Sequence, residues 1–223
     1  MDNGGQNRSA KLVMVRHGES HGNVGQRLET RVPGPHLTDH GAAQAARFGA
    51  AVTGSPRLFC SAASRARQTA EQIESVVGGP VTVLAGVHEV QAGDFEGLES
   101  DAAHQAFHQT YQRWHHGELD VAVPGGEAGK DVLDRFLPVL EDLRVRYLTP
   151  DARTDVVLVS HGMAMRLAAG AIGGVPTAFA AGTRLDFTQT IELTPRYGPA
   201  AQFLGWACTR WGHHVPPFGD IVT

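Results

Sequence analysis

The chain has 223 residues, of which 42% are hydrophobic and 19% charged, the balance of an ordinary globular protein. Its formal net charge of -4 gives no basic excess, which argues against a nucleic-acid binder, although a few local arginines can still dominate a pocket for an anionic small molecule. Two cysteines, Cys60 and Cys208, are too few for a disulfide framework and fit a reducing cytoplasm.

The predicted organisation is a single domain behind a short leader. Residues 1–10 are polar and rich in Gly and Asn, and we expect a flexible leader there. No signal peptide or transmembrane run is visible, so we expect a cytoplasmic protein with no membrane partner. Residues 11–223 are enough to bury a full core and are expected to form one domain, with an insertion at about 99–123.

The first predicted strand carries the most informative residues. Residues 12–15 are apolar, which is typical of a buried strand in a parallel sheet, and Arg16-His17-Gly18 follows at once. Ligands bind outside the carboxyl ends of strands in open α/β sheets, so this strand would deliver Arg16 and His17 to that edge. The neighbouring cation disfavours the imidazolium, which would leave His17 as a neutral nucleophile or base. The alternative is that both residues only mark where a buried strand reaches water.

Strands and helices alternate along the rest of the chain. Residues 19–35 contain several Gly and Pro, which predicts a long irregular loop, and Thr38 is the expected N-cap of the next helix. Further strands are predicted at residues 56–60, 81–84, 155–160, 184–193 and 202–208, and further helices at residues 64–77, 101–116, 127–147 and about 163–172. This order predicts an α/β fold with a mostly parallel central sheet flanked by helices and a small helical insertion.

A second strand ends in the same way as the first. The apolar residues 156–159 are followed by Ser160-His161-Gly162. If the two strands are parallel neighbours, His17 and His161 arrive at the same edge of one sheet. Two histidines at matched positions, one with an arginine beside it, favour a phosphoryl-transfer site over two unrelated polar residues.

These segments together resemble the histidine phosphatase superfamily, in its phosphoglycerate mutase-like branch. The resemblance begins with Arg16-His17-Gly18-Glu19-Ser20 and Gly22-Asn23 and ends with Ser160-His161-Gly162. The intervening segments that resemble family motifs are residues 37–45, 61–70, 89–97 and 124–127. The matches follow the family order from Val13 to about Leu167, and their combination is far more specific than any one of them.

The resemblance implies roles for individual residues. His17 would be the nucleophile that becomes a phosphohistidine. Arg16, Arg65 and His161 would surround the phosphoryl oxygens, and Asn23 would add a hydrogen bond. No metal ion or other cofactor is implied, because the two forked guanidiniums supply the positive charge that phosphoryl transfer requires.

Glu89 is the implied proton donor to the leaving oxygen and the base for the incoming water. Asp94 and Glu96 lie in the same loop and are the alternative carboxylates, and Arg67 is the alternative to Arg65 as a phosphate ligand. Residues two apart on a helix point to different faces, so only one of these two arginines can face the site. The register of the motifs favours Glu89 and Arg65.

The implied function is hydrolysis of a phosphate monoester, a small phosphorylated metabolite, through the phosphohistidine. The glycolytic mutases of the family carry a longer insertion whose basic residues hold the substrate carboxylate, whereas residues 99–123 contain one arginine, Arg113, and no lysine. A phosphoglycerate mutase is the alternative, and a non-catalytic module that binds a phosphorylated ligand is a third interpretation. A homodimer is left open.

For the tryptophans and for two pairs of histidines we expect structural positions and no catalytic role. Trp114, Trp206 and Trp211 are expected in the core or in a dimer contact. The histidine pairs at 115–116 and 213–214 are expected at the surface, because adjacent residues do not face one point and no metal-ligand spacing is present.

Overall fold

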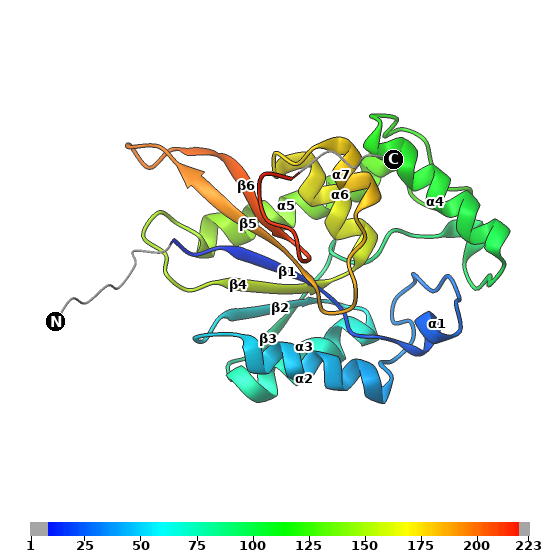
Figure 1. Cartoon of the computed structure of the whole chain (residues 1–223), viewed down its shortest axis with the longest axis horizontal. Helices are drawn as coiled ribbons and strands as arrows, with labels where there is room; N and C mark the ends of the chain where they lie inside the picture. Colours follow the sequence, from blue (N-terminus) through cyan, green and yellow to red (C-terminus); the bar gives the residue numbers. More distant parts are fainter. Residues whose placement is uncertain (1–8, 219–223) are drawn as a thin grey trace.

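The computed structural model describes residues 9–218 and contains one six-stranded sheet with the strand order β3-β2-β4-β1-β5-β6 (Figure 1). The strands are β1 (Leu12–Arg16), β2 (Arg57–Ser61), β3 (Val81–Leu84), β4 (Val156–Ser160), β5 (Thr190–Tyr197) and β6 (Phe203–Trp211). The first four are mutually parallel, whereas β5 runs antiparallel to β1 and β6 antiparallel to β5. The predicted mostly parallel α/β sheet is therefore confirmed.

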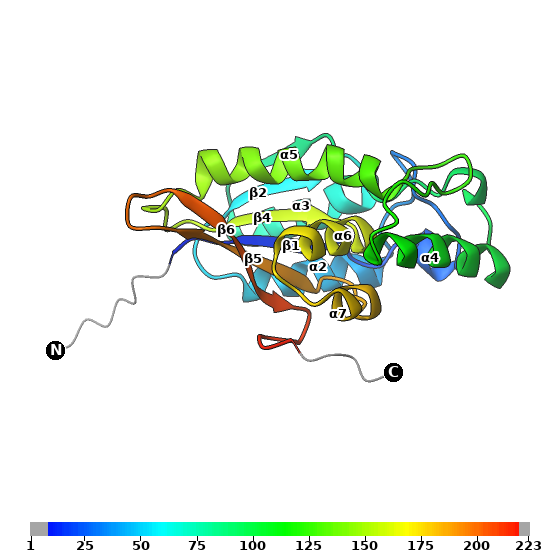
Figure 2. The same ribbon diagram turned by 90° about the horizontal axis from the view of Figure 1, so that it is seen from above.

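Helices cover both faces of the sheet, as the view from above shows (Figure 2). The helices of the chain are α1 (His21–Val24), α2 (Asp39–Ala51), α3 (Ser64–Val77), α4 (Asp101–His115), α5 (Gly129–Tyr147), α6 (Gly162–Ile172) and α7 (Thr177–Gly182), with a short 3-10 turn, η1 (Gly93–Phe95). Of these, α2, α3, α5 and α6 pack on the sheet. Alternate residues of β1 face opposite cores: Val13 and Val15 pack with α3, while Leu12 and Met14 pack with α5 and α6. Burial of each such side chain contributes roughly 1.5–3 kcal/mol, so this strand is a firm base for the residues that follow it.

The register of the two central strands decides where the histidines lie. Strands β1 and β4 are parallel neighbours with Arg16 opposite Ser160. The backbone N–H of His17 donates to the carbonyl of Ser160 at 3.0 Å. The expectation that His17 and His161 leave the same edge of the sheet is confirmed.

Helix α2 packs closely against the turn that follows β1. Thr38 caps the helix as predicted, since its side chain accepts from the N–H of Gly41 at 2.9 Å. A Cβ at Gly18 would clash with the carbonyl oxygen of Gly41. The glycine after His17 is therefore required by the close approach of α2.

Near the end of the chain the structure differs from the sequence prediction in two places. The strand expected at 184–193 begins only at Thr190, because residues 183–189 form an irregular connection in which Thr188 has a φ of +60°. Helix α7 was not predicted, since six small and apolar residues are too short for a helical period to show. The irregular connection bears on the site described below.

The structure also bears on the expectations for the start of the chain, for the tryptophans and for membrane-spanning helices. Most of the expected leader, residues 1–8, lies outside the described residues, and Ala10 is buried. The three tryptophans lie in the core. Within residues 9–218 we find no helix with the length and apolar character needed to cross a membrane.

His115 corrects the expectation that both histidine pairs lie at the surface. Its Nε2 atom is buried without a hydrogen-bond partner, and its ring lies edge-on to Tyr111 with centroids 4.9 Å apart. The helical period of α4 explains this, because Tyr111 and His115 are four residues apart and share the face that packs on the domain. The other three histidines of the pairs are exposed.

Candidate active site

A cavity of about 350 Å³ opens at the carboxyl ends of β1 and β4. Five of the six predicted site residues are among its lining residues: Arg16, His17, Asn23, Arg65 and Glu89. The sixth, His161, is fully buried, does not line the cavity and contacts Arg65 from inside the protein.

The imidazole of His17 is held as one tautomer. Its Nδ1 lies 2.7 Å from the carbonyl oxygen of Gly18, and its Nε2 lies 3.1 Å from Nε of Arg65. A guanidinium can only donate, so Nε2 is the acceptor and the ring proton is on Nδ1. Burial, followed by the charges of Arg65 and Arg16, lowers the pKa of His17 well below its usual value. His17 is a neutral base whose lone pair lies on Nε2.

Arg65 is the second residue of α3 and joins the two histidines. Besides the contact with His17, its Nη2 donates to Nδ1 of His161 at 3.1 Å. Its Nη1 is buried and has no hydrogen-bond partner. Arg67, the alternative ligand, is exposed on another face of the helix and does not line the cavity. Arg65 therefore presents an unused donor in the cavity, which is the condition expected of an anion ligand.

His161 is bonded on both sides of its ring. Since Nδ1 accepts from Arg65, Nε2 carries the proton and donates to the hydroxyl of Ser61 at 2.9 Å. Burial, followed by the charge of Arg65, lowers the pKa of His161 well below its usual value. Ser61 ends β2, beside the end of β4, and no role was predicted for it from the sequence. In this geometry His161 fixes the guanidinium of Arg65.

Arg16 is anchored by the connection that precedes β5. Its Nη1 donates to the carbonyl of Leu185 at 2.5 Å, and its guanidinium lies 4.3 Å from the ring centroid of Phe187. Burial lowers the pKa of Arg16. These contacts leave other donors of the fork for a ligand. No sequence signal pointed to them, since residues 184–189 were expected to belong to a strand.

Asn23 is oriented by the residue that precedes α1. Its Oδ1 accepts from the backbone N–H of Ser20 at 3.0 Å and from the Ser20 hydroxyl at 2.8 Å. With the oxygen occupied, the amide nitrogen of Asn23 is the group available to donate to a ligand in the cavity.

The carboxylate of Glu89 lies at the start of α6. It accepts from the backbone N–H groups of Val90 at 2.9 Å, Ala164 at 2.9 Å and Met163 at 3.2 Å. Three donors and the helix terminus fix its position, and Glu89 lines the same cavity as His17.

The two alternative carboxylates have other surroundings. Asp94 is exposed and does not line the cavity. Glu96 accepts from the backbone N–H groups of Thr30 and Arg31 and from the Thr30 hydroxyl. Glu96 thereby fixes the loop between α1 and α2, and Glu89 is the one of the three that faces the cavity.

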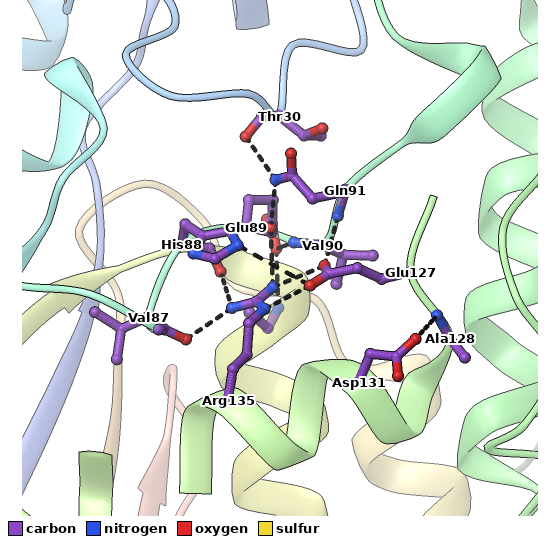
Figure 3. A network of polar contacts seen from close by, with 12 residues as sticks. Thr30, Val87, His88, Glu89, Val90, Gln91, Glu127, Ala128, Asp131 and Arg135 are labelled. Carbon is purple, nitrogen blue, oxygen red and sulfur yellow. Dashed lines mark hydrogen bonds and ion pairs between the residues drawn. The ribbon is translucent and has the colours of Figure 1, made fainter. Parts of the chain in front are cut away.

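The loop that carries Glu89 is clamped from α5 by Arg135 (Figure 3). The guanidinium of Arg135 donates to the carbonyls of Gly86 and His88, both at 2.8 Å, and of Glu89 at 3.1 Å. Glu127 balances the charge of Arg135 with its Oε1, which lies 2.6 Å from Nε of the guanidinium. The other carboxylate oxygen of Glu127 accepts from the backbone N–H of Gln91 at 2.9 Å. The sequence offers no sign of this clamp, because the partners of Arg135 are carbonyls far away along the chain.

Metal-binding residues do not gather at this site. Among residues 9–218 no group of three or more His, Cys, Asp or Glu side chains is arranged to hold a metal ion.

Comparison with known proteins places this geometry in a family. The family model described as histidine phosphatase superfamily (branch 1) matches residues 12–208. A glucosyl-3-phosphoglycerate phosphatase of Mycolicibacterium vanbaalenii is 31% identical over 180 residues, which cover 76% of each chain. A 2,3-bisphosphoglycerate-dependent phosphoglycerate mutase of Azorhizobium caulinodans is 31% identical over 162 residues, covering 70% of this chain and 77% of that protein. The native structure of a mycobacterial glucosyl-3-phosphoglycerate phosphatase superposes with a TM-score of 0.76 at 25% identity, covering 92% of this chain and 99% of that one. This chain is a member of the histidine phosphatase superfamily, branch 1.

Proposed function

We propose that the protein is a phosphomonoester hydrolase that acts on a small phosphorylated metabolite through a phosphohistidine at His17. One observation carries the proposal: His17 lines the cavity with its Nε2 as an acceptor that is bonded only to Nε of Arg65, and Nη1 of Arg65 has no partner. A neutral nucleophile next to a cationic donor without a partner is suited to attack a phosphoryl group. The same arrangement brings no advantage for the packing of the core.

In the first step Nε2 of His17 attacks phosphorus while the bond from phosphorus to the ester oxygen breaks. Arg65 has to turn from Nε2 toward the phosphoryl oxygens, where it joins Arg16 and the amide nitrogen of Asn23. The proposed role of His161 is to orient Arg65 through Nδ1 before the substrate binds and, after the guanidinium has turned, to lie against the phosphoryl group. A protein contributes to this reaction mainly by positioning hydrogen-bond donors at the three equatorial oxygens of the phosphoryl group, which share the negative charge. Guanidinium groups, with their forked donors, suit this geometry.

Glu89 is the proposed proton carrier. Its carboxyl group gives a proton to the departing ester oxygen, and the carboxylate then takes a proton from the water that attacks the phosphohistidine. The second step releases inorganic phosphate and restores His17. The hydrogen bonds from the start of α6 support this role, because they hold the carboxyl group in one orientation.

Hydrolysis is preferred to phosphoryl transfer between hydroxyls. The segment from Glu99 to Val123, where the family's mutases hold the substrate carboxylate with basic residues, contributes no arginine or lysine to the cavity lining. Phosphoglycerate mutase is the alternative function, and one of the relatives carries that name. The third interpretation, a non-catalytic module, gives no reason for Glu89 to line the same cavity as a neutral His17.

A screen of phosphate esters tests the proposal. Sugar phosphates, phosphoserine, phosphoglycerates and nucleotides are incubated with the protein, with and without 2,3-bisphosphoglycerate, and with a chelator throughout. We expect release of inorganic phosphate that needs neither the bisphosphate nor a metal ion. Isomerisation of a phosphoglycerate that depends on 2,3-bisphosphoglycerate would establish the mutase instead.

We also propose that the enzyme works in the cytoplasm. Cys60 and Cys208 are both free, buried thiols, and thiols without disulfides are typical of a reducing compartment.

A further inference from the structure

The segment that joins β2 to α3 contacts both ring nitrogens of His161. Ser61, the last residue of β2, lies with its hydroxyl 2.9 Å from Nε2, and Arg65 donates from Nη2 to Nδ1 at 3.1 Å. The side chains of Ser61 and His161 are both fully buried. Because a guanidinium can only donate, the proton of the neutral ring is on Nε2, and Nδ1 is an acceptor.

The proton on Nε2 of His161 has no route out of the protein. Its partner is the hydroxyl of Ser61, whose oxygen also accepts from the backbone N–H of Ala63 at 3.4 Å. Within residues 9–218 this hydroxyl has no further group to which it can pass a proton. We therefore expect His161 to keep the same tautomer when a ligand enters, because a reversal requires the Nε2 proton to leave.

Nδ1 of His161 loses its donor when Arg65 turns to a phosphoryl group. The guanidinium of Arg65 lies between the two histidines, 3.1 Å from Nε2 of His17 and 3.1 Å from Nδ1 of His161, and the ring centroids are 5.2 Å apart. A phosphoryl group that takes the place of this guanidinium therefore lies against Nδ1. The oxygens of a phosphoryl dianion only accept hydrogen bonds, so two acceptors would face each other in a buried place, which is costly.

One proton between the two acceptors removes this conflict, and the free protein does not hold it. The charged or titratable groups that act on His161 are Arg65, His17, His88 and Arg135, and no carboxylate is among them. Burial, followed by the charge of Arg65, lowers the pKa of His161 well below its usual value, so Nδ1 is unprotonated before a ligand binds. The proton has to arrive with the ligand.

We propose that the site binds a phosphoryl group together with one proton, which lies between a phosphoryl oxygen and Nδ1 of His161. A monoanion brings this proton with it, whereas a dianion binds only with uptake of a proton from solution. The inference rests on the proposed function and adds which ionic form of the substrate the free enzyme takes. Phosphate monoesters lose their second proton near pH 6, so their affinity should fall about 10-fold per pH unit above that value.

Calorimetry with methylphosphonate and difluoromethylphosphonate counts this proton without turnover. Fluorine lowers the second pKa of the phosphonate, so at pH 7.5 the first ligand is partly a monoanion and the second is a dianion. Titrations in two buffers with different ionisation enthalpies give the number of protons taken up on binding. We expect uptake of about one proton with difluoromethylphosphonate, less with methylphosphonate, and a fall of about 10-fold per pH unit in the affinity for the dianion.

Four variants locate the proton. His161→Gln presents an amide N–H to the phosphoryl oxygen and should bind the dianion without proton uptake. Glu89→Gln and His17→Ala each remove another group that is able to take a proton, and both should keep the uptake near that of the wild type. His88→Gln is the matched control, because it removes an imidazole that acts on His161 from outside the cavity lining, and it should change neither the affinity nor the uptake.

Two results overturn the inference. One is binding of the dianion to the wild type without proton uptake, and the other is an uptake that survives in His161→Gln or is lost in Glu89→Gln or His17→Ala. The proposed function fails separately: proton uptake that depends on His161, in a protein that hydrolyses no phosphate ester, would overturn the hydrolase and leave the shared proton standing.

Discussion

Nε of Arg65 lies 3.1 Å from Nε2 of His17 and covers the atom that is proposed to attack phosphorus. Burial, followed by the charge of this guanidinium, lowers the pKa of His17, and Nη1 of Arg65 is a buried donor without a partner. Arg65 thus helps to keep the imidazole neutral in the free protein and is positioned to transfer its donors to an incoming phosphoryl group. The two functions belong to one side chain, so they can be tested by one substitution.

Arg65→Gln should raise the pKa of His17, because a positive charge beside the imidazole is removed. The same change should lower kcat by about 10²–10³-fold, the usual effect of losing one preorganised donor. Titration of the imidazole by NMR and steady-state kinetics measure the two effects. Arg67→Gln is the matched control on the same helix and should change neither, since Arg67 is exposed and outside the cavity.

His17→Ala should abolish a covalent intermediate. Wild-type protein quenched during turnover of a labelled ester should retain phosphate that is labile in acid and stable in base, as expected for phosphohistidine. The variant should retain none and should lose turnover, because no other group takes over a covalent step. Wild-type activity in the variant would show that His17 is not the nucleophile.

Glu89→Gln should act according to the leaving group. An alkoxide needs a proton to depart and p-nitrophenolate does not, so the first step should slow about 10²–10⁴-fold for an alkyl phosphate and much less for p-nitrophenyl phosphate. Without a base for water, the phosphohistidine should accumulate with p-nitrophenyl phosphate and give a pre-steady-state burst. Asp94→Asn should show neither effect, because Asp94 does not line the cavity. Equal losses on both substrates without a burst would mean that another carboxylate carries the proton.

The strands that position His17 and His161 were predictable from the sequence. The tertiary contacts that hold the other site residues in place were not. Apolar runs ending in His17 and His161 identify two buried strands, because a parallel sheet imposes that pattern within five or six residues. The proposed role of Glu89 came from the register of the motifs, and the backbone N–H groups of α6 that its carboxylate contacts are more than 70 positions away along the chain. The anchoring of Arg16 by Leu185 lies in a segment whose residues resemble a strand, and only tertiary packing shows that it is a connection.

Arg135→Gln should impair the same step as Glu89→Gln, more weakly. The guanidinium of Arg135 holds three carbonyls of the loop that carries Glu89, and its loss should let the carboxyl group move from its place at α6. We expect a loss of about 10- to 100-fold with an alkyl phosphate and a smaller loss with p-nitrophenyl phosphate. Arg146→Gln, an exposed residue of the same helix, is the control. A uniform loss on both substrates would mean that Arg135 supports the fold and not the proton transfer.

His115 makes the stability of the protein depend on pH in a defined direction. Burial, followed by the charge of Arg166, lowers its pKa to about 4, whereas a histidine in the unfolded chain titrates near 6.5. Between these values the unfolded chain binds a proton that the folded protein does not. The free energy of unfolding therefore falls as the pH drops below about 6.5, by about 2 kcal/mol at pH 5 from this residue.

Urea unfolding at pH 7.5 and pH 5 measures this contribution. His115→Gln should lose about 2 kcal/mol less stability than the wild type on acidification, because glutamine does not titrate. His17 and His161 are buried with lowered pKa values in both proteins, so their contributions cancel in the comparison. His116→Gln, next in the chain and exposed, should follow the wild type. If His115→Gln and the wild type lose the same stability, His115 takes up its proton over the same pH range in the folded and the unfolded protein, and burial against Tyr111 does not lower its pKa.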